Sequence, residues 1–281
     1  MKKQITRMAV FLSFSLLVVL SNGYCGATKK DFESSNSISA QGHNGQSIAD
    51  YTKAIGINPN DAKVYYSRGR AYFEQGDLSQ AIADYTQAVK INPDLAEAYT
   101  SRGVAYAKQG NSAQAIADYT RAIEINPKNM EAYYNRGTAY AAQGKPSQVI
   151  ADLTKAIEIN PDFAEAYGNR GAAYADQDNG PKAIADYTQA IALKPQYATP
   201  YYNRGFTYAG QGKTSQAITD FTKAIELNPQ YARAYSQRAI VYLTTKEYDK
   251  AWIDVHKVEE LGFAVNPRFL KSLKMDSGRE K

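Results

Sequence analysis

Apolar residues recur along most of the chain at steps of three, four and seven, which is the period of an α-helix that buries one face. In residues 96–129, one such run fills the first half of the segment and a second run fills the other half. Gly110 and Asn111 interrupt the pattern between the halves, and Pro127 ends the second run. The segment therefore predicts two helices joined by a tight turn.

The same pattern returns along the chain with a fixed period. Six prolines lie thirty-four residues apart, and they are Pro59, Pro93, Pro127, Pro161, Pro195 and Pro229. A fixed period of this length predicts stacked helical hairpins, each of which buries its apolar face against its neighbours. Such an array differs from a closed globule built around one active site.

The residue types within each unit resemble the tetratricopeptide repeat. Position 4 of the unit is tyrosine in all six copies, as is position 11, and position 8 is glycine in five of them. Residues 62–265 form six such units, and a half unit at residues 45–61 precedes them. The resemblance implies an all-α, right-handed solenoid of helical hairpins, closed by a capping helix and a loose tail at residues 266–281.

The N-terminus has the three-part pattern of a cleaved signal peptide. A basic start is followed by a thirteen-residue apolar stretch, 8–20, and then by small residues. This pattern predicts a signal peptide at 1–27 with cleavage after Gly23 or Ala27. The apolar stretch is shorter than the roughly 20 residues that span a bilayer. We therefore expect an exported protein, periplasmic or secreted. Lipid attachment at Cys25 is the alternative, disfavoured by the bulky Tyr24 before it.

Composition narrows the class of protein further. The net charge is +5, and the signal segment supplies three of those charges, so the remaining balance of about +2 gives no argument for a nucleic-acid partner. Residues 28–44 are rich in serine, asparagine and glutamine, which predicts a disordered linker. The chain carries no metal-binding spacing, phosphate loop or nucleophile motif. We predict no catalytic activity, no cofactor and no metal site.

A row of opposite charges follows the repeat. Position 7 is arginine in all six units, from Arg68 to Arg238, and position 23 is aspartate seven times, from Asp50 to Asp254. The arginines could form a basic stripe for an anionic ligand. They could instead pair with the aspartates, because a guanidinium suits a carboxylate, and the matched period favours this ladder. The sequence leaves open whether pairing is within or between units.

The resemblance also implies a binding surface, because the first helices of such hairpins line a concave groove. Asparagines at position 6 resemble the ladders that hold a peptide backbone, although they could equally be solvated amides. An acidic row at position 2 favours a segment with a basic middle, unless it is a solvated face at the helix starts. The candidate groove residues are Asn135, Asn169, Asn203, Tyr66, Tyr134, Tyr202, Glu97, Glu131, Glu165, Phe206 and Gln237.

These patterns together predict a non-catalytic scaffold or adaptor of the cell envelope that binds an extended protein or peptide segment. A clamp for a terminal carboxylate is disfavoured, because position 5 is never lysine and position 9 is never asparagine. The alternative is a structural protein that associates with itself through the open helical edge of the half unit. We expect no nucleic-acid partner and no membrane-spanning segment.

Overall fold

The computed structural model describes residues 44–279, and these form fourteen α-helices and no strand. The predicted signal peptide at 1–27 and the predicted linker up to residue 43 lie outside the described residues. The chain divides between Pro161 and Asp162 into two units. We call residues 44–161 the N-terminal unit and residues 162–279 the C-terminal unit.

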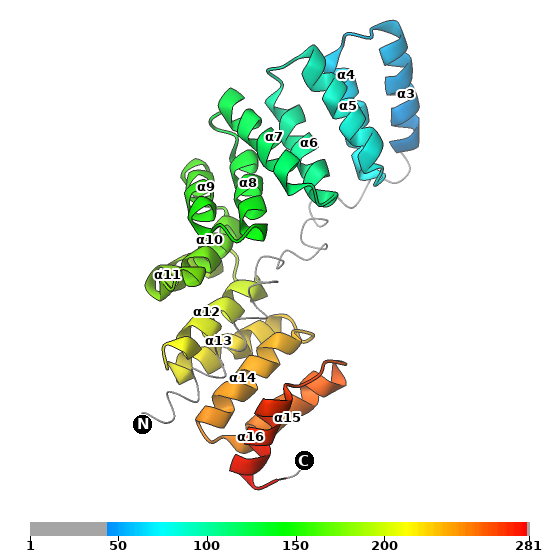
Figure 1. Cartoon of the computed structure of the whole chain (residues 1–281). Coiled ribbons are helices and arrows are strands. Elements are labelled where there is room, and N and C mark those ends of the chain that lie inside the picture. The colour runs from blue at the N-terminus through cyan, green and yellow to red at the C-terminus, as the bar shows by residue number, and fades with distance from the viewer. Residues whose placement is uncertain (1–43, 280–281) are drawn as a thin grey trace. The chain divides into compact units, whose positions relative to one another are not determined.

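The N-terminal unit is a stack of antiparallel helical hairpins preceded by a single helix. Its helices are α3 (Asn44–Ile57), α4 (Ala62–Glu74), α5 (Leu78–Ile91), α6 (Ala96–Lys108), α7 (Ser112–Ile125), α8 (Met130–Ala142) and α9 (Pro146–Ile159). The hairpins are α4 with α5, α6 with α7 and α8 with α9, and each second helix packs on the next first helix (Figure 1). The first helices α4, α6 and α8 also contact one another. We call the surface that they share the first-helix face.

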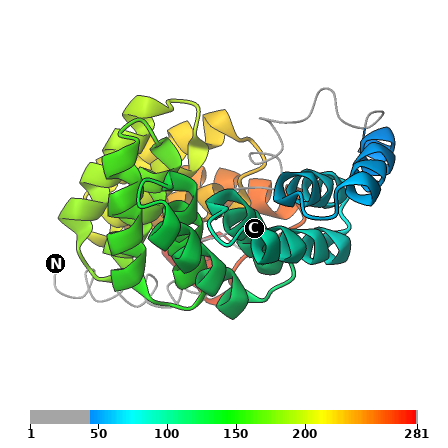
Figure 2. The same ribbon diagram turned by 90° about the horizontal axis from the view of Figure 1, so that it is seen from above.

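The C-terminal unit repeats this arrangement and ends on a single helix. Its helices are α10 (Ala164–Asp176), α11 (Gly180–Leu193), α12 (Ala198–Gly210), α13 (Thr214–Leu227), α14 (Ala232–Thr244), α15 (Tyr248–Glu260) and α16 (Pro267–Ser277). Here the first-helix face consists of α10, α12 and α14, and α16 packs against α15. Figure 2 shows the hairpins of each unit from above. The predicted fold class, an all-α stack of repeat hairpins with a capping helix, is confirmed.

One backbone position recurs at the turn inside each hairpin. Gly110 has a φ of 82° there, and glycine occupies the same position in four of the units. Asp178 and Lys246 stand at this position in the other two, with φ of 56° and 63°, although side chains disfavour this conformation. In the turn of Asp178, the glycine is displaced to position 180, and Pro181 lies in the first turn of α11, where its missing N–H is tolerated.

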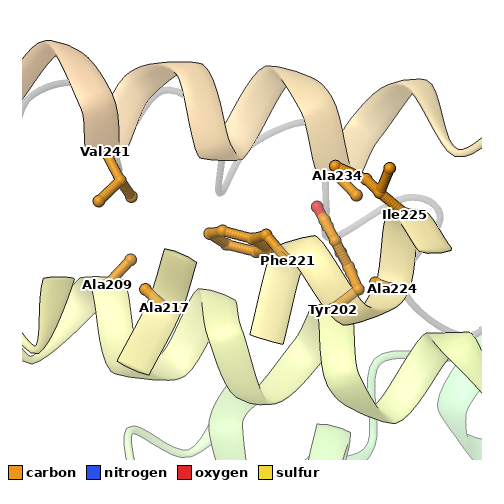
Figure 3. Close-up of a cluster of buried hydrophobic side chains, with 8 residues drawn as sticks. All are labelled: Tyr202, Ala209, Ala217, Phe221, Ala224, Ile225, Ala234 and Val241. Carbon is orange, nitrogen blue, oxygen red and sulfur yellow. The ribbon is translucent and has the colours of Figure 1, made fainter. Parts of the chain in front are cut away.

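Close helix approach explains the small residues in the repeat. A Cβ atom added to Gly103 on α6 would lie 2.6 Å from the ring of Tyr119 on α7. Alanines at the helix contacts are fully buried, and Ala115 and Ala122 are examples. In the C-terminal unit, Phe221 and Tyr202 fill the space between α12, α13 and α14 (Figure 3). The tyrosines and phenylalanines at these places therefore act as packing.

Two glycines of the N-terminal unit give a matched prediction. We expect Gly103→Ala to destabilise the protein, because displacing the Tyr119 ring costs about 1–3 kcal/mol and better helix propensity returns only about 1 kcal/mol. Gly137→Ala makes milder contacts, with Leu153 at 3.2 Å and with the Cβ atom of Asp152 at 3.4 Å, so we expect its loss to be smaller or absent. Urea denaturation of both variants measures the difference, and equal losses would contradict this packing model.

Candidate functional site

The charged ladder pairs arginine with aspartate inside each repeat. Arg102 on α6 donates from Nε to Asp118 Oδ2 at 2.8 Å and from Nη2 to Asp118 Oδ1 at 2.7 Å. Its Nη1 donates to Thr86 Oγ1 on the preceding second helix at 3.1 Å. The arginine therefore joins its own hairpin through the carboxylate and the previous hairpin through threonine. The other pairs are Arg68–Asp84, Arg136–Asp152, Arg170–Asp186, Arg204–Asp220 and Arg238–Asp254.

The ladder is buried, which decides between its two interpretations. The paired aspartate side chains are 1–9% exposed and the arginine side chains 14–17%. Tyrosine rings also cover the guanidinium groups, as Tyr99 covers Arg102 at 5.5 Å. Burial raises the pKa of Asp254, the most buried of these carboxylates, against the opposing effect of Arg238. A basic stripe open to an anionic ligand is excluded, and the structural ladder is confirmed.

The first-helix face of the N-terminal unit carries five of the predicted groove residues. Tyr66 packs its ring at 5.8 Å from the ring of Tyr85, and its hydroxyl accepts a long hydrogen bond of 3.5 Å from Ser101. Tyr134 is half-buried on α8. The amide nitrogen of Asn135 is buried and has no hydrogen-bond acceptor among the described residues.

The other two of these residues are acidic. Glu97 on α6 and Glu131 on α8 are both exposed at the starts of their helices. The surrounding protein nevertheless raises the pKa of Glu131 by desolvation, and the charge of Arg70 on α4 opposes that rise.

The remaining predicted residues belong to the C-terminal unit and differ in their surroundings. Glu165 forms an ion pair with Lys194 at 2.8 Å, so its charge is balanced within the unit. Asn169 on α10 and Asn203 on α12 are partly exposed. Phe206 is half-buried, and its ring lies 6.5 Å from that of Tyr202. The predicted residues thus form two separate sets, one on each unit.

Tyr202 is a core residue in the structure. It is 7% exposed, and its ring lies 5.0 Å from Tyr231 and 5.8 Å from Phe221 (Figure 3). Tyr66 stands at the same position of its own repeat and is half-buried. Tyr202 therefore supports the first-helix face from below and offers little of its ring for contact with a ligand.

The buried tyrosines predict a loss of stability in alkali. Burial raises the pKa of Tyr202 from 10.0 to about 12, and desolvation also raises those of Tyr85, Tyr119 and Tyr231. Between those pH values the unfolded chain releases a proton that the folded chain keeps, so the free energy of unfolding falls as the pH rises above 10. For Tyr202 alone this loss is about 2–3 kcal/mol.

Denaturation curves at successive pH values, with tyrosinate absorbance as a second probe, measure this effect. Tyr202→Phe removes one titrating group from the same place, so its stability should fall less steeply above pH 10 than that of the wild type. Identical pH profiles for the two proteins would contradict the assignment of Tyr202 to the core.

Models of one repeat family match most of the chain. Models described as TPR repeat match residues 39–76, 69–110, 105–144 and 179–212, and models described as tetratricopeptide repeat match 131–163, 198–231 and 221–253. The chain belongs to the tetratricopeptide repeat family. No curated protein matches this TPR chain.

Solved TPR structures are similar over a large part of the chain. YrrB, described as a TPR protein with an unusual peptide-binding site, is 26% identical over 66% of this chain and 95% of its own, with a TM-score of 0.59. MamA is 29% identical over 59% of this chain and 96% of its own, with a TM-score of 0.55. A TPR protein of Cytophaga hutchinsonii, at 20% identity and a TM-score of 0.66, shares the fold over 83% of this chain and 95% of its own.

Three features of this TPR protein were not anticipated from its sequence. The threonines that link the ladder to the preceding repeat recur at position 25 of the unit, and this recurrence is the sequence pattern that could have predicted the link. Lys194 replaces the asparagine that usually precedes the repeat proline, and it balances Glu165. Gln237 is only 8% exposed and lines a cavity beside α16, which includes Arg268 and Lys271.

Two negative findings concern the described residues. Residues 44–279 hold no group of three or more histidine, cysteine, aspartate or glutamate side chains arranged to bind a metal ion. Across the same range, every helix is too short or too polar to cross a membrane.

Proposed function

We propose that this TPR protein is a non-catalytic adaptor whose first helices hold an extended segment of a partner protein on a concave surface. The observation that carries the proposal is the pair of asparagines with unused hydrogen-bonding groups. The amide nitrogen of Asn135 has no hydrogen-bond acceptor among the described residues. The side-chain amide of Asn203 forms no hydrogen bond with any described residue. An amide side chain donates and accepts, as a peptide group does, so both asparagines suit a peptide backbone.

The charges suggest which part of the segment each unit prefers. Glu97 and Glu131 are exposed on the N-terminal unit, whereas Lys194 balances Glu165 on the C-terminal unit. A basic stretch of the partner would therefore favour the N-terminal unit. Half-buried Phe73, with Lys108 Nζ at 4.5 Å from its ring, adds an aromatic contact at the other end of these helices, since Glu97 lies in the first turn of α6 and Lys108 in its last. The peptide-binding site described for YrrB, which is 26% identical, supports the assignment of this function.

Export is the second part of the proposal. Its support is the basic, apolar and small-residue pattern of residues 1–27. Fractionation of the source cell, followed by mass spectrometry of the mature N-terminus, tests it. An N-terminus just after Gly23 or Ala27 in an envelope or secreted fraction is expected, whereas an intact Met1 in the cytoplasm would contradict export.

An affinity experiment tests the binding function. The mature chain serves as bait for an extract of the source cell, beside a variant carrying Asn135→Ala, Asn169→Ala and Asn203→Ala. A matched control carries Arg121→Ala and Glu124→Ala, which removes an exposed ion pair of the second helix α7. We expect a partner that the wild type and the control retain and the asparagine variant loses. A partner retained by all three, in proteins that melt alike, would exclude the first-helix face.

Self-association is a second candidate function, because α3 packs mainly against α4 among the described helices. Ile57 is 87% exposed at its end, and none of the side chains described on this helix is fully buried. A second copy could cover this edge. Sedimentation velocity over a range of concentrations separates the candidates, since an adaptor that works as a single chain keeps a constant size. A shift to larger species that Ile57→Lys abolishes would favour self-association.

A further inference from the structure

The C-terminal unit contains a cavity that the proposed function has not used. It has a volume of about 400 Å³ and lies among α14, α15 and α16, with the segment before α16 closing one side. Its apolar lining comes from Ile240, Val255, Val258, Val265 and Phe269. A cavity of this size falls in the range that small ligands and side chains occupy in proteins.

A buried amide without a hydrogen bond lines this cavity. Gln237 on α14 is 8% exposed, and its side chain forms no hydrogen bond with any residue in the described range. Ser101, at the same position of an earlier repeat, donates to a tyrosine hydroxyl of the preceding repeat. The amide atoms of Gln237 are open to the cavity, because Asn135 Nδ2 is the only fully buried side-chain nitrogen or oxygen without a partner among the described residues. A bound group that both accepts and donates would replace solvent at this amide. A peptide group has both functions.

The lining is also positively charged. Arg268 and Lys271 on α16 contribute to it, and the lining contains no acidic residue. The first turn of α16 adds to this potential, because its N–H groups lie at the positive end of the helix dipole. Asn266 satisfies two of those N–H groups, so a ligand is attracted by charge and need not replace the cap. The chemistry therefore combines an apolar wall, a peptide-like amide and cations.

We propose that this cavity takes a large apolar side chain of the bound segment, next to an acidic residue of the same segment. This proposal rests on the proposed function, because it names a chemical feature of the partner segment. Ile240, Val255 and Val258 contact the apolar side chain. Gln237 binds the peptide group beside it. Lys271 attracts the acidic residue and thereby fixes the direction of the segment at this end of the C-terminal unit.

Methyl NMR of the full chain tests the proposal, with Ile240, Val255, Val258 and Val265 as reporters. The probe is the blocked peptide acetyl-Asp-Leu-Asp-amide, titrated into the millimolar range. We expect saturable shifts of these methyl groups. The matched peptides acetyl-Asp-Ala-Asp-amide and acetyl-Lys-Leu-Lys-amide should bind at least about tenfold more weakly, because each lacks one part of the complementary chemistry. Equal shifts with all three peptides, or none with any, would overturn the proposal.

Two substitutions and a control locate the binding chemistry. Gln237→Leu should weaken acetyl-Asp-Leu-Asp-amide about tenfold while the melting temperature stays equal or rises, since an unpaired amide is removed. Lys271→Glu should reverse the preference toward acetyl-Lys-Leu-Lys-amide. Lys274→Glu changes an exposed lysine of α16 that does not line the cavity, so it should leave the preference unchanged. Unchanged peptide affinity in both Gln237→Leu and Lys271→Glu would contradict the proposed site.

Sodium octanoate forms the last arm, because it offers apolar and anionic groups without a peptide group. Methyl shifts with octanoate but not with the peptides would assign the cavity to a free carboxylic acid and refute the present proposal. The asparagine variant of the affinity experiment leaves the cavity lining intact. If the cavity binds the peptide but no partner depends on the asparagines of the first-helix face, only the proposed function is refuted. If a partner depends on those asparagines but the cavity does not bind the peptide, only this inference is refuted.

Discussion

Asp118→Ala should be among the most destabilising single substitutions in the N-terminal unit, at about 3–5 kcal/mol. The substitution removes both carboxylate acceptors of Arg102, whose side chain is only 15% exposed. The guanidinium then keeps Thr86 as its hydrogen-bond partner and remains charged, half-enclosed beside the ring of Tyr99. The loss reflects an uncompensated charge more than the strength of the original ion pair. Urea denaturation of the full chain measures it, with hydrogen exchange of α6 and α7 locating the change.

Two controls separate burial from charge. Glu124→Ala breaks the exposed pair Arg121–Glu124 on the same helix and should cost less than about 1 kcal/mol. The double variant Arg102→Met with Asp118→Leu removes both charges and should recover much of the loss, because apolar residues replace buried ion pairs well. A loss in Asp118→Ala no larger than that in Glu124→Ala would show that the ladder contributes little to stability.

The ladder also constrains where a partner can bind. Arginines of the ladder use three nitrogens on one carboxylate and one threonine, and these three bonds are seen at Arg68, Arg102, Arg136, Arg204 and Arg238. Arg136, for example, bonds to Asp152 and Thr120. The same threonine hydroxyl donates to the carbonyl of Ile116, so both of its functions are used. The charges of the ladder are paired within the fold and are not available to a partner protein. Recognition of a partner therefore depends on other polar groups. In the proposed function, those groups are the amides of Asn135 and Asn203 and the exposed carboxylates of Glu97 and Glu131.

The repeat pattern was sufficient for the architecture because each position has the same local neighbours in every copy. Tyr119 meets Gly103 in one repeat as Tyr85 meets Gly69 in another, so one unit predicts the next. The arginine and aspartate of the ladder follow the same rule, although only the structure shows that they pair within a hairpin. A threonine hydroxyl completes the link to the preceding hairpin. Matching of opposite charges alone does not predict this contact, because threonine is uncharged.

The candidate site was less predictable because it depends on neighbours that vary between repeats. Tyr66 and Tyr202 share one position, and each packs on the aromatic ring of its own second helix. Only Tyr202 meets a further ring, that of Tyr231, where the repeat of Tyr66 has Leu95. Glu165 belongs to the acidic row by position, but Lys194 balances it where most other repeats carry asparagine. The cavity beside Gln237 depends on how α16 closes the array, and α16 lies outside the repeat period.

Phe221→Ala should destabilise the C-terminal unit by about 3–5 kcal/mol. Phe221 is fully buried and packs with Tyr202 across the contact of α12, α13 and α14. Removal of the ring leaves a void beside Gly205, whose missing side chain cannot fill it. Urea denaturation of the full chain measures the loss, with hydrogen exchange of α12 and α13 as the local probe.

The chain itself supplies the control for this substitution. In α9 the equivalent positions hold Val149 and Leu153, both fully buried, where α13 has Ala217 and Phe221. The double variant Ala217→Val with Phe221→Leu copies that natural pair and keeps the packed volume, so its loss should stay below about 1.5 kcal/mol. A double variant as unstable as Phe221→Ala would show that the aromatic ring, and not the filled volume, stabilises α12 against α14. The repeats would then not be interchangeable in their packing.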